Sequence, residues 1–220
     1  MEKSEILTQD QIVLLKKIAS VPFFKEHFYL TGGTPLAAFY LRHRYSEDLD
    51  FFSEQEIDVM ALQTFFKSIK KEFDILEIDY QQSFNRNLFF LKLKSGALKT
   101  EFTYFPFTRI EKGGERFGVS VDSLLDIAVN KLFTIYQRTK ARDYIDLYCI
   151  CKKHAFTIAE LVKKARIKFD THIDSLQLGT QFIKAKEAVD YPRMLHDISV
   201  QEWQEFFLQE AKKLQPQIIE

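Results

Sequence analysis

Cysteine is scarce in this 220-residue sequence, which contains only Cys149 and Cys151. Both fall in a segment with a helical pattern, where residues two apart point in different directions, so they are not placed for a structural disulfide or a metal-binding Cys-x-x-Cys pair. This scarcity excludes a small secreted domain stapled by disulfides. It favours a reducing environment, and we expect a cytoplasmic location.

Long apolar runs are also lacking at the N-terminus, where the one continuous run covers residues 12–15 and is followed by Lys16 and Lys17. Such a run is too short for the core of a signal peptide and far too short to span a membrane. We therefore expect neither export nor a membrane partner.

The chain has no excess charge of either sign, because 31 basic residues balance 31 acidic ones. A uniformly basic protein that coats polyanions is therefore excluded. The charges are nevertheless segregated: residues 47–79 hold ten acidic residues and three lysines, residues 86–116 hold seven basic and three acidic residues, and residues 131–153 hold six basic and two acidic residues. This segregation is compatible with a local basic surface.

The front half of the chain mixes strand and helix patterns, whereas the back half is helical almost throughout. We expect strands at residues 28–30, 48–52, 73–80, 87–94, 98–105 and 117–121. We expect helices at residues 35–41, 59–71, 124–135 and 142–151, and further helices after capping-box patterns at Thr8, Thr157 and Ser199, the first ending near Ser20 and Pro22. These patterns predict an α+β domain at residues 1–121, with a mixed sheet and flanking helices, and a C-terminal helical bundle at residues 122–220.

Two aspartates stand two residues apart in the second expected strand. Asp48 and Asp50 flank Leu49, and side chains two apart in a strand point to the same face, so both carboxylates can reach one divalent cation. A solvated strand end with two ordinary surface aspartates would give the same pattern. On the D-x-D pattern alone, the two interpretations have equal weight.

A glycine pair precedes the expected helix at residues 35–41. Gly32 and Gly33 follow the first strand, where backbone N–H groups and the positive helix end are available to a phosphate. A tight turn is the simpler interpretation of the pair taken alone. Because this helix leads directly into Asp48 and Asp50, the spacing favours a phosphate site next to a metal site.

Two longer blocks of sequence contain these residues. The first covers residues 30–37 and 43–51, and the second covers residues 126–132, Arg138 and residues 142–148. Together they resemble the nucleotidyltransferase-like toxins (AbiEii) of the bacterial abortive-infection AbiE system, in the polymerase-β-like nucleotidyltransferase superfamily. The resemblance implies a nucleotidyltransferase fold in which the glycine pair holds a nucleoside triphosphate and the aspartate pair holds Mg²⁺.

The resemblance also implies roles for individual residues. The metal ligands would be Asp48, Asp50 and Glu101, and the catalytic residues would be these three and Lys131. The nucleotide would be bound by Gly32, Gly33, Thr34, Arg44, Ser46, Lys131 and Asp143. Glu101 stands where the family more often has aspartate, and its longer side chain can still ligate Mg²⁺.

The second block has a structural interpretation as well. Lys131 lies on an otherwise apolar helix face, where a lysine with a packed stem and a solvated amine would fit nearly as well as a phosphate ligand. Asp143 and Asp146, three residues apart on one helix near Arg138 and Arg142, would also form a structural ion-pair network. For Asp146 we favour the structural role.

These inferences predict a metal-dependent enzyme that transfers a nucleotide from a nucleoside triphosphate to a hydroxyl of RNA, such as a tRNA end, or of a protein, releasing pyrophosphate. The family implies the toxin of a toxin–antitoxin pair in abortive-infection phage defence, with a cognate antitoxin as partner. A phosphoesterase or a glycosyltransferase with a D-x-D motif fits less well, because Phe51 and Phe52 follow the motif and few residues precede it. A degenerate fold that binds nucleotide or RNA without catalysis is the nonenzymatic alternative.

Overall fold

The computed structural model describes residues 6–214. They form two compact units. The first comprises the residues up to Ala38 together with Ser46–Thr108 and Lys112–Asp122, and the second comprises Phe39–Tyr45, Arg109–Glu111 and the chain from Ser123 onward.

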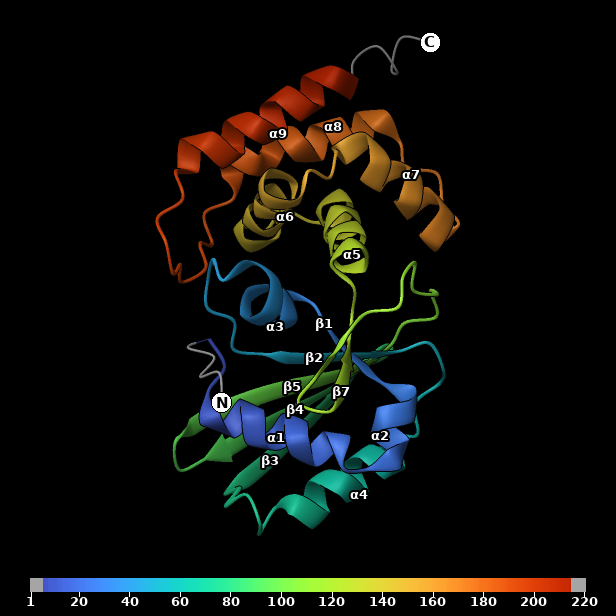
Figure 1. Ribbon diagram of the computed structural model, residues 1–220, viewed down its shortest axis with the longest axis vertical. Helices are drawn as coiled ribbons and strands as arrows, with labels where there is room; N and C mark the ends of the chain where they lie inside the picture. Colours follow the sequence, from blue (N-terminus) through green and yellow to red (C-terminus); the bar gives the residue numbers. More distant parts are fainter. Residues whose placement is uncertain (1–5, 215–220) are drawn as a thin grey trace. The chain divides into compact units, whose positions relative to one another are not determined.

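The first unit is built on a mixed β-sheet (Figure 1). Among the described residues the sheet has seven strands in the order β3-β4-β5-β2-β1-β7-β6. The strands are β1 (Tyr29–Thr31), β2 (Leu49–Ser53), β3 (Glu77–Ser83), β4 (Arg86–Leu93), β5 (Gly96–Tyr104), β6 (Glu115–Arg116) and β7 (Val119–Val121). The pairs β2–β5 and β1–β7 are parallel and the others are antiparallel, which confirms the predicted mixed sheet.

Three helices of the first unit lie against one face of this sheet (Figure 1). They are α1 (Gln9–Ala19), α2 (Pro22–His27) and α4 (Val59–Ile69), and a short helix α3 (Gly33–Pro35) follows β1. The core between helices and sheet is aromatic: Phe102 of β5 lies 5.0 Å from Phe51 and 5.5 Å from Phe24, measured between ring centroids. Because neighbouring strand residues alternate between faces, the residues next to Phe51 and Phe102 are directed to the opposite face.

The first helix ends as predicted, at Ala19 with Ser20 as its C-cap. Pro22 begins a second helix, α2, which sequence analysis missed; this first helical position suits proline because no backbone donor is needed there. One local expectation for this unit was wrong. The strand expected from residue 73 starts at Glu77, because residues 70–74 form a turn in which Asp74 has a φ of +51°.

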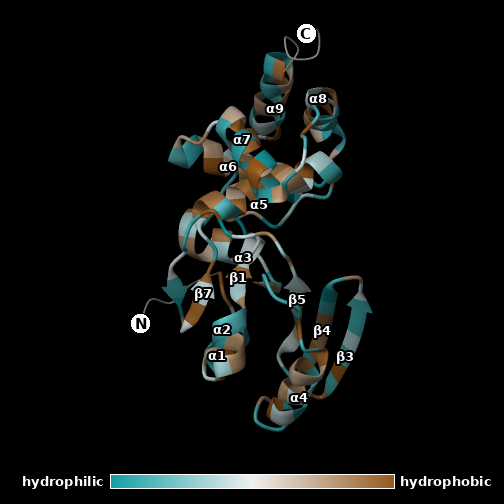
Figure 2. Cartoon of the chain, turned by 90° about the vertical axis from the view of Figure 1, so that its right-hand side faces the viewer, coloured by the Kyte–Doolittle hydropathy of each residue, from teal (hydrophilic) through white to brown (hydrophobic). Residues whose placement is uncertain are grey.

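The second unit is helical. Its helices are α5 (Leu124–Gln137), α6 (Ala141–His154), α7 (Ile158–Phe169), α8 (Ser175–Ile183) and α9 (Val200–Leu214), with a 3₁₀ turn at Lys184–Glu187. A π-helical segment, Leu36–Leu41, continues from α3 and enters this unit at Phe39. Hydrophobic and hydrophilic residues are mixed along these helices, as in Figure 2, and the buried core contains Tyr144, Phe182, Trp203 and Phe207.

Hydrophobic periodicity predicted α5 and α6, and capping-box patterns predicted α7 and α9. The Thr157 hydroxyl accepts from the Glu160 backbone, and the Glu160 side chain accepts from Thr157, which is a complete capping box at the start of α7. Sequence analysis missed α8, whose start is capped by Asp174 without a capping-box partner. None of the helices in residues 6–214 is long and apolar enough to cross a membrane.

Candidate active site

Two carboxylates meet on neighbouring strands of the first unit. Asp50 of β2 is in register with Glu101 of the parallel strand β5 and with Thr31 of the antiparallel strand β1. Register partners point to the same face of a sheet, which here is the face opposite the aromatic core. Asp48 immediately precedes β2 and is two residues from Asp50. The structure therefore brings the three predicted metal ligands to one face of the sheet.

Two basic residues accompany these carboxylates. The Lys99 amine lies 2.7 Å from Oδ2 of Asp48. The Arg86 guanidinium donates from Nε and from a terminal nitrogen to the two oxygens of Glu101, at 2.6 Å each. Sequence analysis missed both partners. The position of Lys99 was predictable, because it lies two residues before Glu101 in the same strand and therefore on the same face. Arg86 reaches Glu101 only through the β4–β5 register, which the sequence does not show.

The charges of this cluster are coupled. Burial raises the pKa of Glu101, but hydrogen bonds from Arg86 and from the Thr103 hydroxyl outweigh it, so the pKa is lowered overall. The hydrogen bond to Glu101 raises the pKa of Arg86, and the charges of Asp50 and Asp48 add to this effect. Glu101 is therefore an ionised carboxylate at neutral pH. It is paired with Arg86, whose pKa is also raised by the charges of Asp50 and Asp48.

The donor set suits a hard divalent cation, because ionised carboxylate oxygens are the ligands that Mg²⁺ prefers. Lys99 and Arg86 contact the same carboxylates in this structure. Within residues 6–214 no group of three or more His, Cys, Asp or Glu side chains is arranged to hold a metal ion. The residue types of Asp48, Asp50 and Glu101 suit Mg²⁺, but in this structure Asp48 and Glu101 pair with Lys99 and Arg86, so their role as metal ligands stays a prediction.

Gly32 lies directly against Asp50. Its φ is +81°, and a β-carbon at this position would stand 3.0 Å from Oδ2 of Asp50. Both the backbone conformation and the space therefore require glycine. Thr34, one residue after Gly33, is hydrogen-bonded through its hydroxyl to the carbonyl of Asp48 and to Oγ of Ser46, the latter at 2.8 Å. The turn and the acidic strand are thus joined by side-chain contacts.

Gly32→Ala is expected to lower the transfer rate, because the added methyl group displaces the Asp50 carboxylate. It should also cost about 1–3 kcal/mol of stability, the usual cost of a non-glycine residue in this backbone region. Gly96→Ala is the matched control, since Gly96 also has a positive φ of +143° but has nothing within 4 Å of its added β-carbon. The temperature of thermal unfolding should fall in both variants, whereas the rate of nucleotide transfer should fall only in Gly32→Ala. Equal transfer rates in the two would contradict the contact with Asp50.

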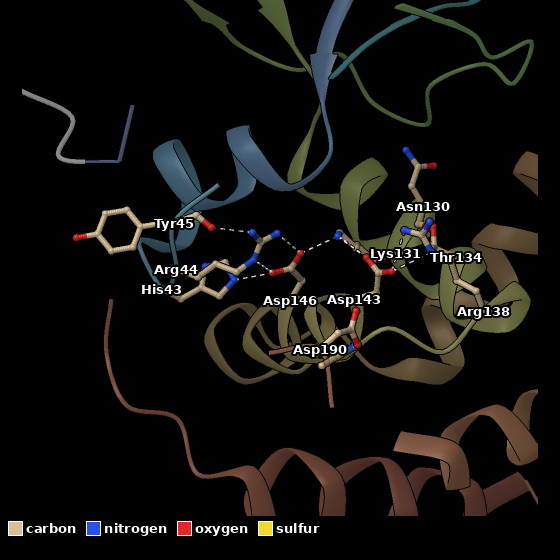
Figure 3. A network of polar contacts seen from close by, with 11 residues as sticks. His43, Arg44, Tyr45, Asn130, Lys131, Thr134, Arg138, Asp143, Asp146 and Asp190 are labelled. Atoms are coloured by element: carbon tan, nitrogen blue, oxygen red, sulfur yellow. Dashed lines mark hydrogen bonds and ion pairs between the residues drawn. The ribbon is translucent and has the colours of Figure 1, made fainter. Parts of the chain in front are cut away.

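The remaining predicted residues belong to the second unit. Lys131 of α5 is buried, and its amine lies 2.7 Å from Asp143 and 2.7 Å from Asp146, both on α6 (Figure 3). Arg138 also contacts Asp143, at 3.1 Å, with its side chain half exposed. Lys131 therefore bridges two carboxylates.

Asp146 is the centre of this network (Figure 3). The Arg44 guanidinium donates to both of its oxygens, at 2.6 and 2.8 Å, and Nε2 of His43 lies 2.8 Å from Oδ1. Burial raises the pKa of Asp146, but the charges of Lys131 and Arg44 outweigh it and hold the pKa well below its usual range. Such a geometry is what the structural interpretation of Asp143 and Asp146 requires.

The fold is shared with solved structures, two of which are described as nucleotidyltransferases. JHP933 from Helicobacter pylori has a TM-score of 0.60 at 19% identity, covering 99% of this chain and 94% of that one. A putative nucleotidyltransferase from H. pylori has a TM-score of 0.60 at 20% identity, covering 96% of this chain and 97% of that one. MenT4, a nucleotidyltransferase toxin from Mycobacterium tuberculosis H37Rv, has a TM-score of 0.55 at 13% identity, covering 93% of this chain and 82% of that one.

The sequence defines the family. The family model described as nucleotidyl transferase AbiEii toxin, type IV TA system, matches residues 13–212. The chain belongs to this family and is a nucleotidyltransferase, which confirms the resemblance and extends it well past the two motif blocks. An uncharacterized protein from Aquifex aeolicus (strain VF5) is 28% identical over 211 residues, or 94% of this chain and 97% of that protein.

Proposed function

We propose that the protein is the toxin of a toxin–antitoxin pair and transfers a nucleotide from a nucleoside triphosphate to a hydroxyl of an RNA or protein acceptor, with Mg²⁺ as cofactor. The observation that carries the proposal is the meeting of three elements on one face of the sheet. Asp50 is in register with Glu101, and Gly32 leaves space for the Asp50 carboxylate that a β-carbon would fill. The glycine turn therefore lies against Asp50, which is in register with Glu101.

The roles follow from position and charge. Asp48, Asp50 and Glu101 would hold Mg²⁺, which when bound lowers the pKa of the acceptor hydroxyl and offsets charge on the leaving pyrophosphate. The backbone of Gly32 and Gly33, with Thr34 and Ser46, would position the triphosphate. The acceptor oxygen then forms a bond to the α-phosphorus, the bond to pyrophosphate breaks, and Glu101 takes the hydroxyl proton.

The basic partners tune this site. Lys99 and Arg86 offset the repulsion among the three carboxylates. The pairing with Arg86 lowers the pKa of Glu101, which makes Glu101 a weak base for as long as the pair is formed. We therefore propose ligation as the main role of Glu101, with proton transfer following the release of Arg86.

The network of the second unit supports a phosphate-binding role. The cations Arg44, Lys131 and Arg138 surround the two carboxylates of Asp143 and Asp146, which leaves one positive charge in excess. We propose that Lys131, positioned by Asp143 and Asp146, and Arg44, positioned by Asp146, bind phosphate with this excess positive charge.

The proposed function is tested by incubating the protein with each labelled nucleoside triphosphate, Mg²⁺ and either total cellular RNA or total protein. Label should enter one of the two fractions, with release of pyrophosphate, and chelation of Mg²⁺ should stop it. Coexpression of the neighbouring gene product as antitoxin should relieve growth arrest. Nucleotide binding without any labelled product would instead favour a degenerate binding module.

A further inference from the structure

The turn of the β3–β4 hairpin has an unusual residue. Ser83 pairs with Arg86, so Phe84 and Asn85 form a two-residue turn. Phe84 has a φ of +50° and is 96% exposed. Positive φ at the first central position of such a turn favours Gly, Asn or Asp, because a β-carbon is strained there. The backbone of Phe84 is therefore strained, and burial of its side chain within this chain does not offset the strain.

The surroundings of this turn are polar. Arg86 follows the turn directly and is the first residue of β4. Gln81, Gln82 and Asn85 are exposed beside Phe84, and the turn end of the hairpin has mainly the hydrophilic colour in Figure 2. A protein-binding surface would be expected to present several apolar residues together. A single aromatic ring among amides and one arginine is instead suited to binding a nucleic-acid base and the neighbouring phosphate.

The turn is also close to the carboxylates. Arg86 is two residues from Phe84, and its guanidinium pairs with Glu101 while half of the side chain remains exposed. The β4–β5 register places Arg86 opposite Thr103, the residue two after Glu101 on the same face. A strand of nucleic acid held at the turn would therefore pass beside the candidate active site in the same unit.

We propose that Phe84 and Arg86 bind the acceptor as single-stranded RNA, with Phe84 stacking on a base and Arg86 contacting the neighbouring phosphate. Base stacking on an exposed aromatic ring beside basic groups is how single strands are commonly held. The inference rests on the proposed nucleotide transfer and selects RNA over a protein hydroxyl as acceptor. It also explains why a strained, exposed phenylalanine stands at this turn.

The experiment measures the binding of a fluorescently labelled single-stranded RNA by anisotropy, without nucleoside triphosphate or Mg²⁺. Phe84→Gly should weaken binding roughly 5- to 100-fold, the range for loss of one base–aromatic stack. Its melting temperature should not fall, because glycine accepts the positive φ. Phe84→Trp should keep the affinity, and its exposed indole should be quenched by RNA against the background of the buried Trp203.

Phe117→Gly is the matched control. Phe117 has a φ of +53° at the first position of the two-residue β6–β7 turn, but it is half buried. Strands β6 and β7 are separated from β4, which carries Arg86, by β5, β2 and β1 in the sheet. This variant should bind RNA like the parent protein. An RNA strand of the same length without bases should bind Phe84→Gly and the parent equally, since it has nothing to stack.

Equal affinity of Phe84→Gly and the parent for base-bearing RNA would overturn the inference. An equal loss of affinity for the strand that lacks bases would also overturn it. So would nucleotide transfer to a protein acceptor, if that transfer depended on Phe84 and the protein did not bind RNA. A failure of the proposed nucleotide transfer is distinguishable from a failure of this inference. The transfer is tested by the labelling assay with variants of the carboxylates, whereas RNA binding is measured without the reaction.

Discussion

Asp50→Asn is expected to reduce nucleotide transfer by at least about 10²-fold, the scale on which loss of one electrostatic contact to the transition state acts. The substitution keeps the size of the side chain and removes the charge that is in register with Glu101 and 3.0 Å from the β-carbon position of Gly32. Stability should be unchanged or higher, because one of three neighbouring negative charges is lost. Initial rates with labelled nucleotide and thermal unfolding measure the two effects.

Asp79→Asn is the control for this variant. Asp79 is also a strand aspartate, but it is exposed on β3 and accepts a hydrogen bond only from the nearby Gln81 among the side-chain contacts described. It should leave both rate and stability unchanged. Full transfer activity in Asp50→Asn would show that the aspartate pair does not hold the metal, and the proposed site would have to be abandoned.

Asp146→Asn is expected to destabilise the second unit by about 3–5 kcal/mol, the usual cost of leaving a buried charge without its partner. Asp146 is fully buried and is contacted by Arg44, Lys131 and His43, all at 2.6–2.8 Å. An amide cannot neutralise these groups. Urea unfolding, monitored by circular dichroism, measures the loss of stability. The control is Asp170→Asn, because Asp170 is exposed and has a left-handed backbone conformation at the end of α7, which asparagine tolerates.

A double variant separates the network from general damage. Lys131→Met alone leaves Asp143 and Asp146 short of a cation, whereas Lys131→Met combined with Asp146→Asn removes charges of both signs. The double variant should therefore lose less stability than the sum of the two single losses. Additive losses, or an unfolding free energy of Asp146→Asn within about 0.5 kcal/mol of the parent, would contradict a coupled network.

Local sequence signals predicted most elements of the fold and the family. The glycine pair was correctly placed directly after β1 and Asp50 was correctly placed in β2, because each signal lies within a few residues, whereas Asp48, expected within the strand, immediately precedes it. Pro22 and Asp174 show where local signals were ambiguous, since proline can end one helix or begin another and a single capping aspartate resembles a turn residue.

The partners of the site residues were not predictable in the same way. Arg86 reaches Glu101 through strand register, and Arg44 reaches Asp146 across 102 residues of sequence. No local pattern encodes such pairings. For Lys131 the sequence offered a phosphate ligand and a packed lysine as alternatives, and the structure adds two carboxylate partners that neither alternative included. Its contact with nucleotide stays a prediction.

The parallel pairing of β2 with β5 has a consequence for synthesis of the protein. Asp48 and Lys99 are 51 residues apart, and the β3–β4 hairpin and α4 are made between them. Closing so long a segment is slow compared with forming a local hairpin. A nascent chain on the ribosome therefore has its aspartate pair long before it has Glu101 beside it.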